Sequence, residues 1–365
     1  MDESFLTPKV RERIDADALR QLTVSRGGID FSSNDYLGIV RQGLLQPNVP
    51  ASLSHGSTGS RLLSGNSALA EQTEQKIAAF HQAPAALLYH SGYDANTGLL
   101  GCVPQKGDVI LYDRLSHASI RDGIRLSFAE GFSFLHNDVE DLEKKLAQAA
   151  PSARQVFVVT ESVFSMDGDR APLREMAALC RKYRAALVVD EAHATGVIGG
   201  RGEGLVQELG LQEACFARIH TFGKACGCQG AAVIGSEMLK TYLINFSRPF
   251  IYSTAPAPAS VAAIAAAYDL FPAMSEQRAH LRTLIALFRE TPVRFTKAES
   301  DTPVQAVVIP GNSEVRAVAA QLQQHGLDVR PILYPTVPRG GERLRIVLHA
   351  FNTREELTQL LQLLS

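Results

Sequence analysis

Short runs of apolar and β-branched residues alternate along the chain with longer stretches in which apolar residues recur every three or four positions. The short runs predict buried strands at residues 85–90, 108–113, 155–161, 186–192, 216–222 and 230–235. The longer stretches predict amphipathic helices at residues 69–81, 141–150 and 172–183. This alternation predicts an α/β fold in which helices cover both faces of a mostly parallel sheet.

The pattern changes after Pro258, where two long helical stretches follow each other at residues 259–271 and 275–290. Beyond them we expect strands in "PVQAVVIP", "LDVRPIL" and "RLRIVLHA", a helix near 314–325 and a last helix from Thr353. This part of the chain predicts a smaller α+β domain, completed by an N-terminal helix around residues 9–22. We therefore expect three segments: residues 1–45 packing with the small domain, 46–258 as the large domain, and 259–365 as the small domain.

Composition narrows the class of protein. Apolar residues make up 45% of the 365 residues, enough for a substantial core, and 36 basic residues nearly balance 38 acidic ones. No Lys/Arg run stands out, so we expect no nucleic-acid partner. Five cysteines without a C-x-x-C pair favour a reducing compartment. The N-terminus lacks an apolar signal core and the run 259–267 is too short to cross a bilayer, so we expect a cytosolic protein without membrane contact.

Polar residues cluster where the predicted strands end, and ligands of open α/β sheets bind at the carboxyl ends of strands. Asp190 follows "LVV", His117 lies in "DRLSHASI", and Lys224 lies in "TFGK". Taken singly, each has an ordinary explanation: a strand-end Asp is more often a helix cap, a lone His a structural residue, and a lone Lys a solvated charge. Their joint occurrence points to chemistry.

Pyridoxal phosphate is the cofactor that would use these groups together. Its aldehyde reacts with a lysine amine of depressed pKa, and Lys224 between glycines fits that setting. Its pyridine nitrogen needs a buried carboxylate to stay protonated, for which Asp190 is the candidate. We expect His193 to bond the phenolate oxygen and His117 to stack on the ring.

The phosphate of such a cofactor needs backbone N–H donors at the start of a helix. The segment "SGYDAN" offers Gly92 and Tyr93 in that position. The hydroxyl of Thr221, at the end of a predicted strand, is expected to add a side-chain donor.

Seven ordered motifs resemble those of the α-oxoamine synthases, a family of fold-type I pyridoxal-phosphate enzymes that condense an amino acid with an acyl thioester and release CO2. They are "FSSNDYLGI" (31–39), "GSTGSRLLSG" (56–65), "DRLSHASI" (113–120), "ESVFSMDGD" (161–169), "VVDEAHATGVIG" (188–199), "TFGKACGCQGAA" (221–232) and "IYSTAPAP" (251–258). The resemblance implies a seven-stranded large domain. It is greatest to the biotin-pathway members, which use L-alanine and a pimeloyl thioester carried on coenzyme A or acyl carrier protein.

The resemblance also implies roles for individual residues. Lys224 would form the Schiff base, Asp190, His193 and His117 would take the roles given above, and Ser165 would join the cofactor-binding set. Ser253 and Thr254 would reach the phosphate of the neighbouring subunit, which implies a homodimer with active sites at its interface.

For the substrate carboxylate, the resemblance implies Arg20, Thr336 and Arg345. The N-terminal segment before "FSSNDYLG" is short, and the reach of Arg20 depends on it.

Other functions remain open or are disfavoured by spacing. A sister enzyme that uses glycine or serine, an aminotransferase, a β-eliminating lyase and a catalytically silent scaffold subunit are the alternatives. A Walker-type nucleotide site is disfavoured because Ala225 follows the lysine where Ser or Thr is required. Cys226 and Cys228 without matching histidines have poor metal spacing, so we read them as buried fillers and predict no metal site.

Overall fold

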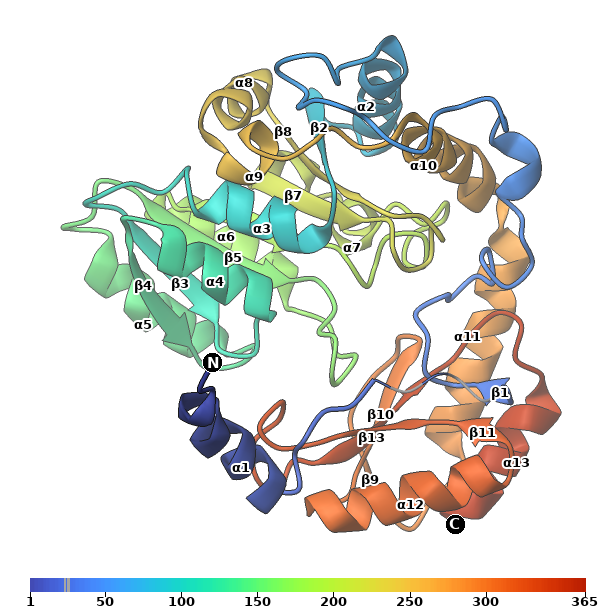
Figure 1. Ribbon diagram of the computed structural model, residues 1–365. Helices are drawn as coiled ribbons and strands as arrows, with labels where there is room; N and C mark the ends of the chain where they lie inside the picture. Colours follow the sequence, from blue (N-terminus) through green and yellow to red (C-terminus); the bar gives the residue numbers. More distant parts are fainter. Residues whose placement is uncertain (23, 25–26) are drawn as a thin grey trace. The chain divides into compact units, whose positions relative to one another are not determined.

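The computed structural model describes residues 1–22, 24 and 27–365, and it divides into two compact units. The larger unit comprises residues 35–165 and 170–278. The smaller unit comprises residues 1–34, 166–169 and 279–365. Both are drawn in Figure 1.

A seven-stranded sheet forms the centre of the larger unit, in the order β2-β8-β7-β6-β5-β3-β4. The strands are β2 (Ala85–Tyr89), β3 (Val109–Asp113), β4 (Glu130–Phe134), β5 (Val156–Glu161), β6 (Ala186–Asp190), β7 (Cys215–Thr221) and β8 (Ala231–Gly235). Only β8 runs antiparallel to its neighbours, so the other six strands point the same way. The mostly parallel seven-stranded sheet predicted above is confirmed.

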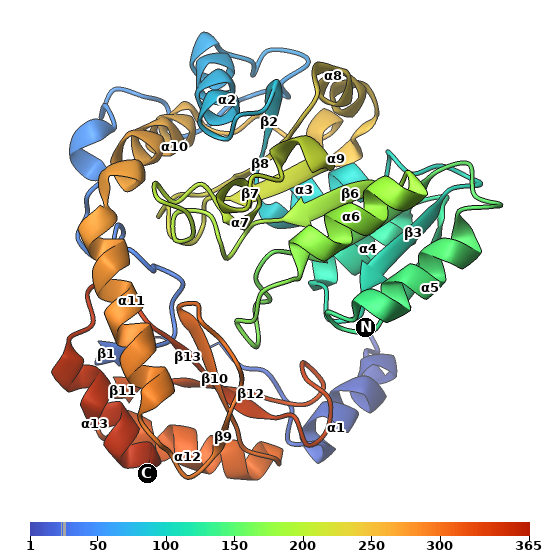
Figure 2. The same ribbon diagram turned by 180° about the vertical axis from the view of Figure 1, so that it is seen from behind.

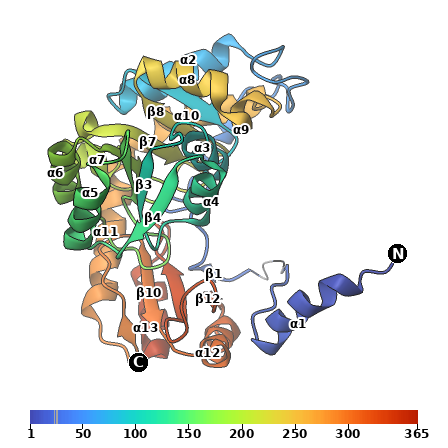
Figure 3. The same ribbon diagram turned by 90° about the vertical axis from the view of Figure 1, so that its left-hand side faces the viewer.

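Helices cover both faces of this sheet because its strands bury apolar side chains on both sides. One face packs against α5 (Val139–Ala149), α6 (Leu173–Tyr183) and α7 (Leu205–Glu208). The other packs against α3 (Gly92–Leu100), α4 (Ala118–Leu126), α8 (Glu237–Phe246) and α9 (Arg248–Ile251). Figure 3 shows α5 and α6 on one side of β3 and β4, with α3 and α4 on the other, and Figure 2 shows α6 in front of the sheet.

Two further helices close the β2 edge of the larger unit. They are α2 (Ala68–Phe80) and α10 (Pro258–Leu270), which pack against each other. The larger unit also contains single turns of 3₁₀-helix at Gln46–Asn48, Gln212–Ala214 and Phe271–Ala273. The predicted helices at 69–81 and 259–271 are therefore confirmed within one residue at each end.

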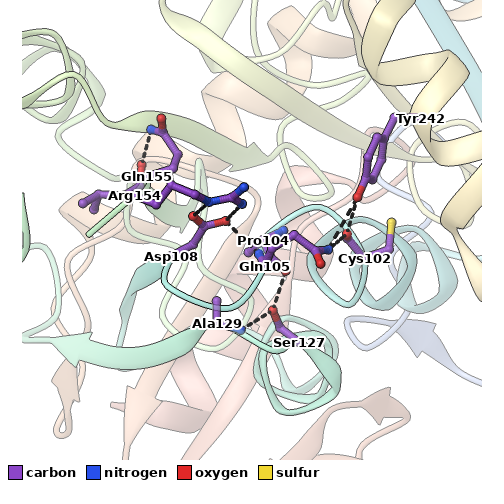
Figure 4. A network of polar contacts seen from close by, with 10 residues as sticks. Cys102, Pro104, Gln105, Asp108, Ser127, Ala129, Arg154, Gln155 and Tyr242 are labelled. Atoms are coloured by element: carbon purple, nitrogen blue, oxygen red, sulfur yellow. Dashed lines mark hydrogen bonds and ion pairs between the residues drawn. The ribbon is translucent and has the colours of Figure 1, made fainter. Parts of the chain in front are cut away.

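The loop that leads into β3 is fixed by a polar network (Figure 4). Arg154 donates two hydrogen bonds to the carboxylate of Asp108, at 2.8 and 2.7 Å. The same carboxylate accepts the backbone N–H of Gln105 at 2.7 Å, and the Gln105 amide donates to the Cys102 carbonyl at 2.6 Å. These bonds hold the pKa of Asp108 below its usual value although burial opposes them, so the loop is tied to the start of β3 by a carboxylate.

The smaller unit contains an antiparallel sheet and a short parallel pair. The sheet has the order β12-β13-β10-β9, from β9 (Thr296–Lys297), β10 (Val304–Val308), β12 (Arg330–Ile332) and β13 (Arg343–Val347). The pair joins β1 (Ile29–Asp30) to β11 (Leu327–Asp328). Its helical segments are a 3₁₀ turn (Ser4–Leu6), α1 (Thr7–Asp15), α12 (Asn312–Gln324), α13 (Arg354–Leu364) and the part of α11 (Ser275–Glu290) from Ala279 onward. Thr353 begins α13 with a reciprocal capping box to Glu356.

Two sequence predictions need correction. The helix expected around 9–22 ends at Asp15, because Asp17 adopts a left-handed backbone (φ 47°) and α1 buries none of its residues. Strand β4 was not predicted, because four of its five side chains are exposed and it lies at the sheet edge. Among the described residues, no helix is long and apolar enough to cross a membrane.

Candidate active site

The carboxyl ends of adjacent parallel strands bring the candidate residues together in the larger unit. Asp190 ends β6, Glu161 ends β5 directly beside it, and Thr221 ends β7 on its other side. Because β2 runs parallel to β7, helix α3, which follows β2, also begins at this edge. The sheet thus gathers segments that lie more than a hundred residues apart in sequence.

Asp190 is held by two donors and is only 5% exposed. Its Oδ2 accepts a hydrogen bond from Asn96 Nδ2 at 2.7 Å, and its Oδ1 accepts the backbone N–H of Ala192 at 2.9 Å. A buried carboxylate needs such donors to replace water. The pair of bonds therefore fixes both the position and the plane of this carboxylate.

His193 lies in the turn after β6 and is likewise buried. Its Nδ1 is 2.6 Å from the hydroxyl of Tyr36, a residue 157 positions earlier in the chain. A strong bond of this kind orients the imidazole ring.

His117 is the N-cap of α4, the helix that follows β3. Its Nδ1 accepts the backbone N–H of Ser119 at 3.2 Å and lies 2.8 Å from the Ser119 hydroxyl. Its own backbone N–H donates to Glu161 Oε1 at 2.6 Å. Partial burial lowers the pKa of His117; Asp190 opposes this effect, and Lys224 adds to it.

Glu161 is almost fully buried next to Asp190. Burial, and then the negative charge of Asp190, raise the pKa of Glu161 to about 8. Two neighbouring carboxyl groups cannot both ionise at low cost, and Glu161 keeps its proton at neutral pH.

Lys224 lies in the loop between β7 and β8 and is half-buried. The loop is a tight turn in which Gly227 N–H bonds the Lys224 carbonyl at 2.9 Å, with a positive φ of 65° at Gly227. The Lys224 charge lowers the pKa of both His117 and Glu161. Lys224 therefore shares one electrostatic environment with the start of α4 and the end of β5.

The start of α3 and the end of β7 approach each other closely. A Cβ on Gly92 would lie 2.5 Å from Thr221 Cγ2, so only glycine fits there. The Thr221 hydroxyl is buried and has no hydrogen-bond partner among the residues that the structure describes. Tyr93, next in the helix, is 47% exposed, and its hydroxyl donates to Asp122 at 2.7 Å.

Three other cofactor candidates lie in loops of the same unit. Ser165 is half-buried in the loop after β5. Ser253 and Thr254 follow α9, and the Thr254 carbonyl is hydrogen-bonded to His90 Nε2. Within the described parts of the chain, no group of three or more His, Cys, Asp or Glu residues is arranged to hold a metal ion.

The substrate-carboxylate candidates belong to the smaller unit. Arg20 Nη2 donates to the Thr336 hydroxyl at 3.2 Å, which brings together two residues 316 positions apart. Arg345, on β13, donates to the Asn34 side chain at 2.9 Å. The short N-terminal segment thus does allow Arg20 to reach Thr336.

Sequence reasoning missed four residues that position the predicted ones: Tyr36, Asn96, Ser119 and Glu161. All four lie inside segments already quoted from the sequence: "FSSNDYLGI", "SGYDAN", "DRLSHASI" and "ESVFSMDGD". A buried polar residue in such a motif was the available signal, but its partner could not be read from spacing.

Comparison with known proteins decides the family, because the family model described as aminotransferase class I and II matches residues 26–364. The chain belongs to the aminotransferase class I and II family. Within it, a relative from Emericella nidulans named 8-amino-7-oxononanoate synthase is 43% identical over 98% of this chain and 93% of its own length. A relative of the same name from Methylobacillus flagellatus is 41% identical over 92% of this chain and 86% of its own length.

Solved structures agree with this assignment. A serine palmitoyltransferase from S. paucimobilis, with PLP bound in combination with myriocin, is 28% identical, covers 99% of this chain and 96% of its own, and has a TM-score of 0.87. The 8-amino-7-oxononanoate synthase of Francisella tularensis is 27% identical, with coverages of 93% and 97% and a TM-score of 0.76. The predicted α-oxoamine synthase family and its fold class are therefore confirmed.

Proposed function

We propose that this chain is a pyridoxal-phosphate-dependent acyltransferase that condenses L-alanine with a pimeloyl thioester. The products are 8-amino-7-oxononanoate, CO2 and the free thiol, and the reaction belongs to biotin biosynthesis. The observation that carries the proposal is the convergence of Lys224, Asp190, His117 and His193 at one edge of the central sheet. The relatives from Emericella nidulans and Methylobacillus flagellatus support this particular member of the family.

The residues present fit the cofactor's phosphate. The first N–H groups of α3, at Gly92 and Tyr93, have no acceptor within the helix and favour an anion. Among the residues that the structure describes, the buried Thr221 hydroxyl has no hydrogen-bond partner, and the methyl group of the same side chain lies so close to Gly92 that a Cβ there would clash with it. Phosphate oxygens would accept hydrogen bonds from all three groups and so satisfy a hydroxyl that the described residues leave unpaired.

The donor set also fits the cofactor's ring. Asp190 would hold the pyridine N–H, because its carboxylate is buried, fixed by two donors and flanked by the protonated Glu161. His193 would bond the phenolate oxygen, Ser165 would add a hydroxyl, and His117 would stack on the ring. When bound, pyridoxal phosphate stabilises negative charge on the substrate carbon by delocalising it into that ring.

Lys224 has two tasks in this proposal. Its amine would hold the cofactor, and once free it would act as the base that removes the proton from the substrate carbon and later gives a proton back. His117, whose pKa is lowered, stays neutral and adds no positive charge beside the amine. Proton transfer is thus assigned to Lys224, and His117 serves to position the acyl substrate.

Further parts of the proposal concern assembly and substrate. Ser253 and Thr254 would bind the phosphate held by a second copy of the chain, which makes the active form a homodimer. In the smaller unit, Arg20, Thr336 and Arg345 would bind the substrate carboxylate. The acyl carrier is coenzyme A or acyl carrier protein, and the reaction takes place in the cytosol.

A sister activity with serine or glycine is the second candidate, since a serine palmitoyltransferase is among the structural neighbours. The two amino acids differ from alanine by small groups, and discrimination at this scale is worth about 1–3 kcal/mol.

The deciding experiment records the visible absorbance of the purified protein with pyridoxal phosphate. L-alanine, glycine and L-serine are then added separately, followed by pimeloyl-coenzyme A. We expect a cofactor band that responds to L-alanine, and release of free thiol with pimeloyl-coenzyme A only in its presence. Lys224→Ala should lose both the lysine-linked band and turnover. Thiol release with glycine or serine alone would favour the sister activity, and absence of any band would refute the proposal.

A further inference from the structure

A buried hydrogen-bond chain connects Asp190 to His117, although these two side chains do not bond directly. Asn96 Nδ2 donates to Asp190 Oδ2 at 2.7 Å and to the Ser119 hydroxyl at 3.1 Å. The Ser119 hydroxyl in turn lies 2.8 Å from His117 Nδ1. Asn96 and Ser119 are each 1% exposed, so water does not compete for these bonds.

The direction of every bond in this chain follows from donor chemistry. Asn96 must turn its NH₂ toward Asp190, because the opposite orientation would set two acceptors 2.7 Å apart. Its two protons then serve Asp190 and Ser119, and the Ser119 hydroxyl keeps its own proton for His117 Nδ1.

His117 Nδ1 is fixed as an acceptor by a second, independent contact. The backbone N–H of Ser119 points at the same nitrogen at 3.2 Å, and a backbone N–H can only donate. Two donors on Nδ1 leave the single proton of the neutral imidazole on Nε2.

We propose that Asn96 and Ser119 are positioning residues that hold His117 as the neutral Nε2–H tautomer and tie its orientation to the Asp190 carboxylate. Given the proposed function on which this rests, His117 meets the cofactor and acyl substrate with an N–H donor and not with a base. The same relay links the group at the pyridine nitrogen to the group on the ring face, so the two are placed together.

The charged groups around His117 come from several elements. They are Asp190 at the end of β6, Lys224 in the loop after β7, and Arg121 and Asp122 on α4; the protonated Glu161 at the end of β5 is a further titratable neighbour. Of the residues that the structure describes, only Ser119 bonds His117 Nδ1, and Ser119 carries no charge. A change at Ser119 therefore leaves this set of charges in place.

The test follows the ring nitrogens of His117 by NMR in the holoenzyme labelled with ¹⁵N-histidine, with His117→Asn to assign the signals. In the wild type we expect an unprotonated Nδ1 and a protonated Nε2 at neutral pH. Ser119→Ala removes one donor to the neutral form, so the His117 titration should move up by about 0.4 to 1 pH unit, the size of one hydrogen bond. Ser119→Thr keeps the hydroxyl and should titrate as the wild type does.

Ser127→Ala is the matched control, because it removes a hydroxyl at the other end of α4 that bonds the Pro104 carbonyl. A wild-type Nδ1–H signal, or an unchanged titration in Ser119→Ala, would overturn the inference.

Asn96→Ala tests the other end of the relay. The Asp190 carboxylate then keeps only the hydrogen bond from the Ala192 backbone among the two described above, so we expect weaker cofactor binding in absorbance titrations. We also expect the titration of His117 to move to higher pH. If Asn96→Ala fails to fold, the Ser119 variants still decide the matter. Failure of the proposed function appears differently, as a wild-type protein without a lysine-linked cofactor band.

Discussion

The contact between Gly92 and Thr221 makes a sharp prediction about cofactor affinity. In Gly92→Ala the new Cβ would lie 2.5 Å from Thr221 Cγ2, well inside ordinary van der Waals contact. Relief requires Thr221 or the first turn of α3 to move, and both would carry phosphate donors. Overpacking of this kind costs about 1–3 kcal/mol. To the extent that cofactor binding must restore the original geometry, the dissociation constant should rise roughly 5- to 150-fold.

The assay is a titration of cofactor-free protein with pyridoxal phosphate, followed by visible absorbance, because the chain has no tryptophan to report binding by fluorescence. Thr221→Ser removes Cγ2 while keeping the hydroxyl, so Gly92→Ala/Thr221→Ser should recover most of the lost affinity. This double-mutant cycle separates the clash from any general effect of alanine in the helix. Gly200→Ala is the control, since a Cβ there meets nothing within 4 Å.

Two results would refute the reasoning. If Gly92→Ala bound the cofactor as tightly as the wild type, the phosphate would not lie at the start of α3. If Thr221→Ser failed to restore binding, the loss would not come from the Thr221 methyl group.

Three further predictions concern buried charge and are measured by urea unfolding. The Glu74 carboxylate is 1% exposed and pairs with Arg61 at 2.7 Å and Lys240 at 2.9 Å, so Glu74→Gln should lower the free energy of unfolding by about 3–5 kcal/mol. Glu143 belongs to an exposed ion pair, so Glu143→Gln should leave the urea midpoint unchanged. Burial lowers the pKa of His220 well below its usual value. Below about pH 6.5 the imidazole therefore binds a proton in the unfolded protein but stays neutral in the folded protein. His220→Asn should gain stability relative to the wild type by up to about 1.4 kcal/mol per pH unit below that value, and a constant difference would contradict this. Glu161→Gln should be at least as stable as the wild type at pH 7, because folding of the wild type must protonate Glu161, whose pKa is about 8; a lower urea midpoint for the variant at that pH would count against this.

The sequence predicted the central sheet well because its inner strands are buried on both faces. Residues 156–161 and 186–190 are nearly continuous apolar runs, which is what a doubly covered parallel strand requires. Strand β4, "EGFSF", has one covered side chain and a glycine, so its pattern carries no such signal. The N-terminal helix was overextended because helical periodicity alone does not show where the chain turns, and Asp17 turns it with a positive φ.

The candidate site divides in the same way. Residues expected to touch the cofactor could be named from motifs, because their chemistry is local: an amine in a glycine-flanked turn, or an acid after a strand. The residues that position them could not be named in this way, because the partners lie far apart in sequence. Asn96 bonds Asp190 across 94 positions, and Tyr36 bonds His193 across 157. Such contacts depend on which strands become neighbours, and the order of strands in a sheet is not encoded in any one stretch of sequence.

These positioning residues explain how one sheet edge can hold two carboxyl groups, an amine and two imidazoles. Glu161 and Asp190 face each other in register, and the buried pair avoids a double charge because Glu161 keeps its proton. As a neutral group, Glu161 still accepts the His117 backbone N–H, so it fixes the start of α4 without adding charge. Asn96 donates one hydrogen bond to Asp190 and one to Ser119, and the Ser119 hydroxyl donates to His117 Nδ1. These bonds orient the Asp190 carboxylate and hold His117 as a neutral ring. The neutral residues therefore determine which groups of the site are charged, and that assignment is what a cationic cofactor ring beside Lys224 requires.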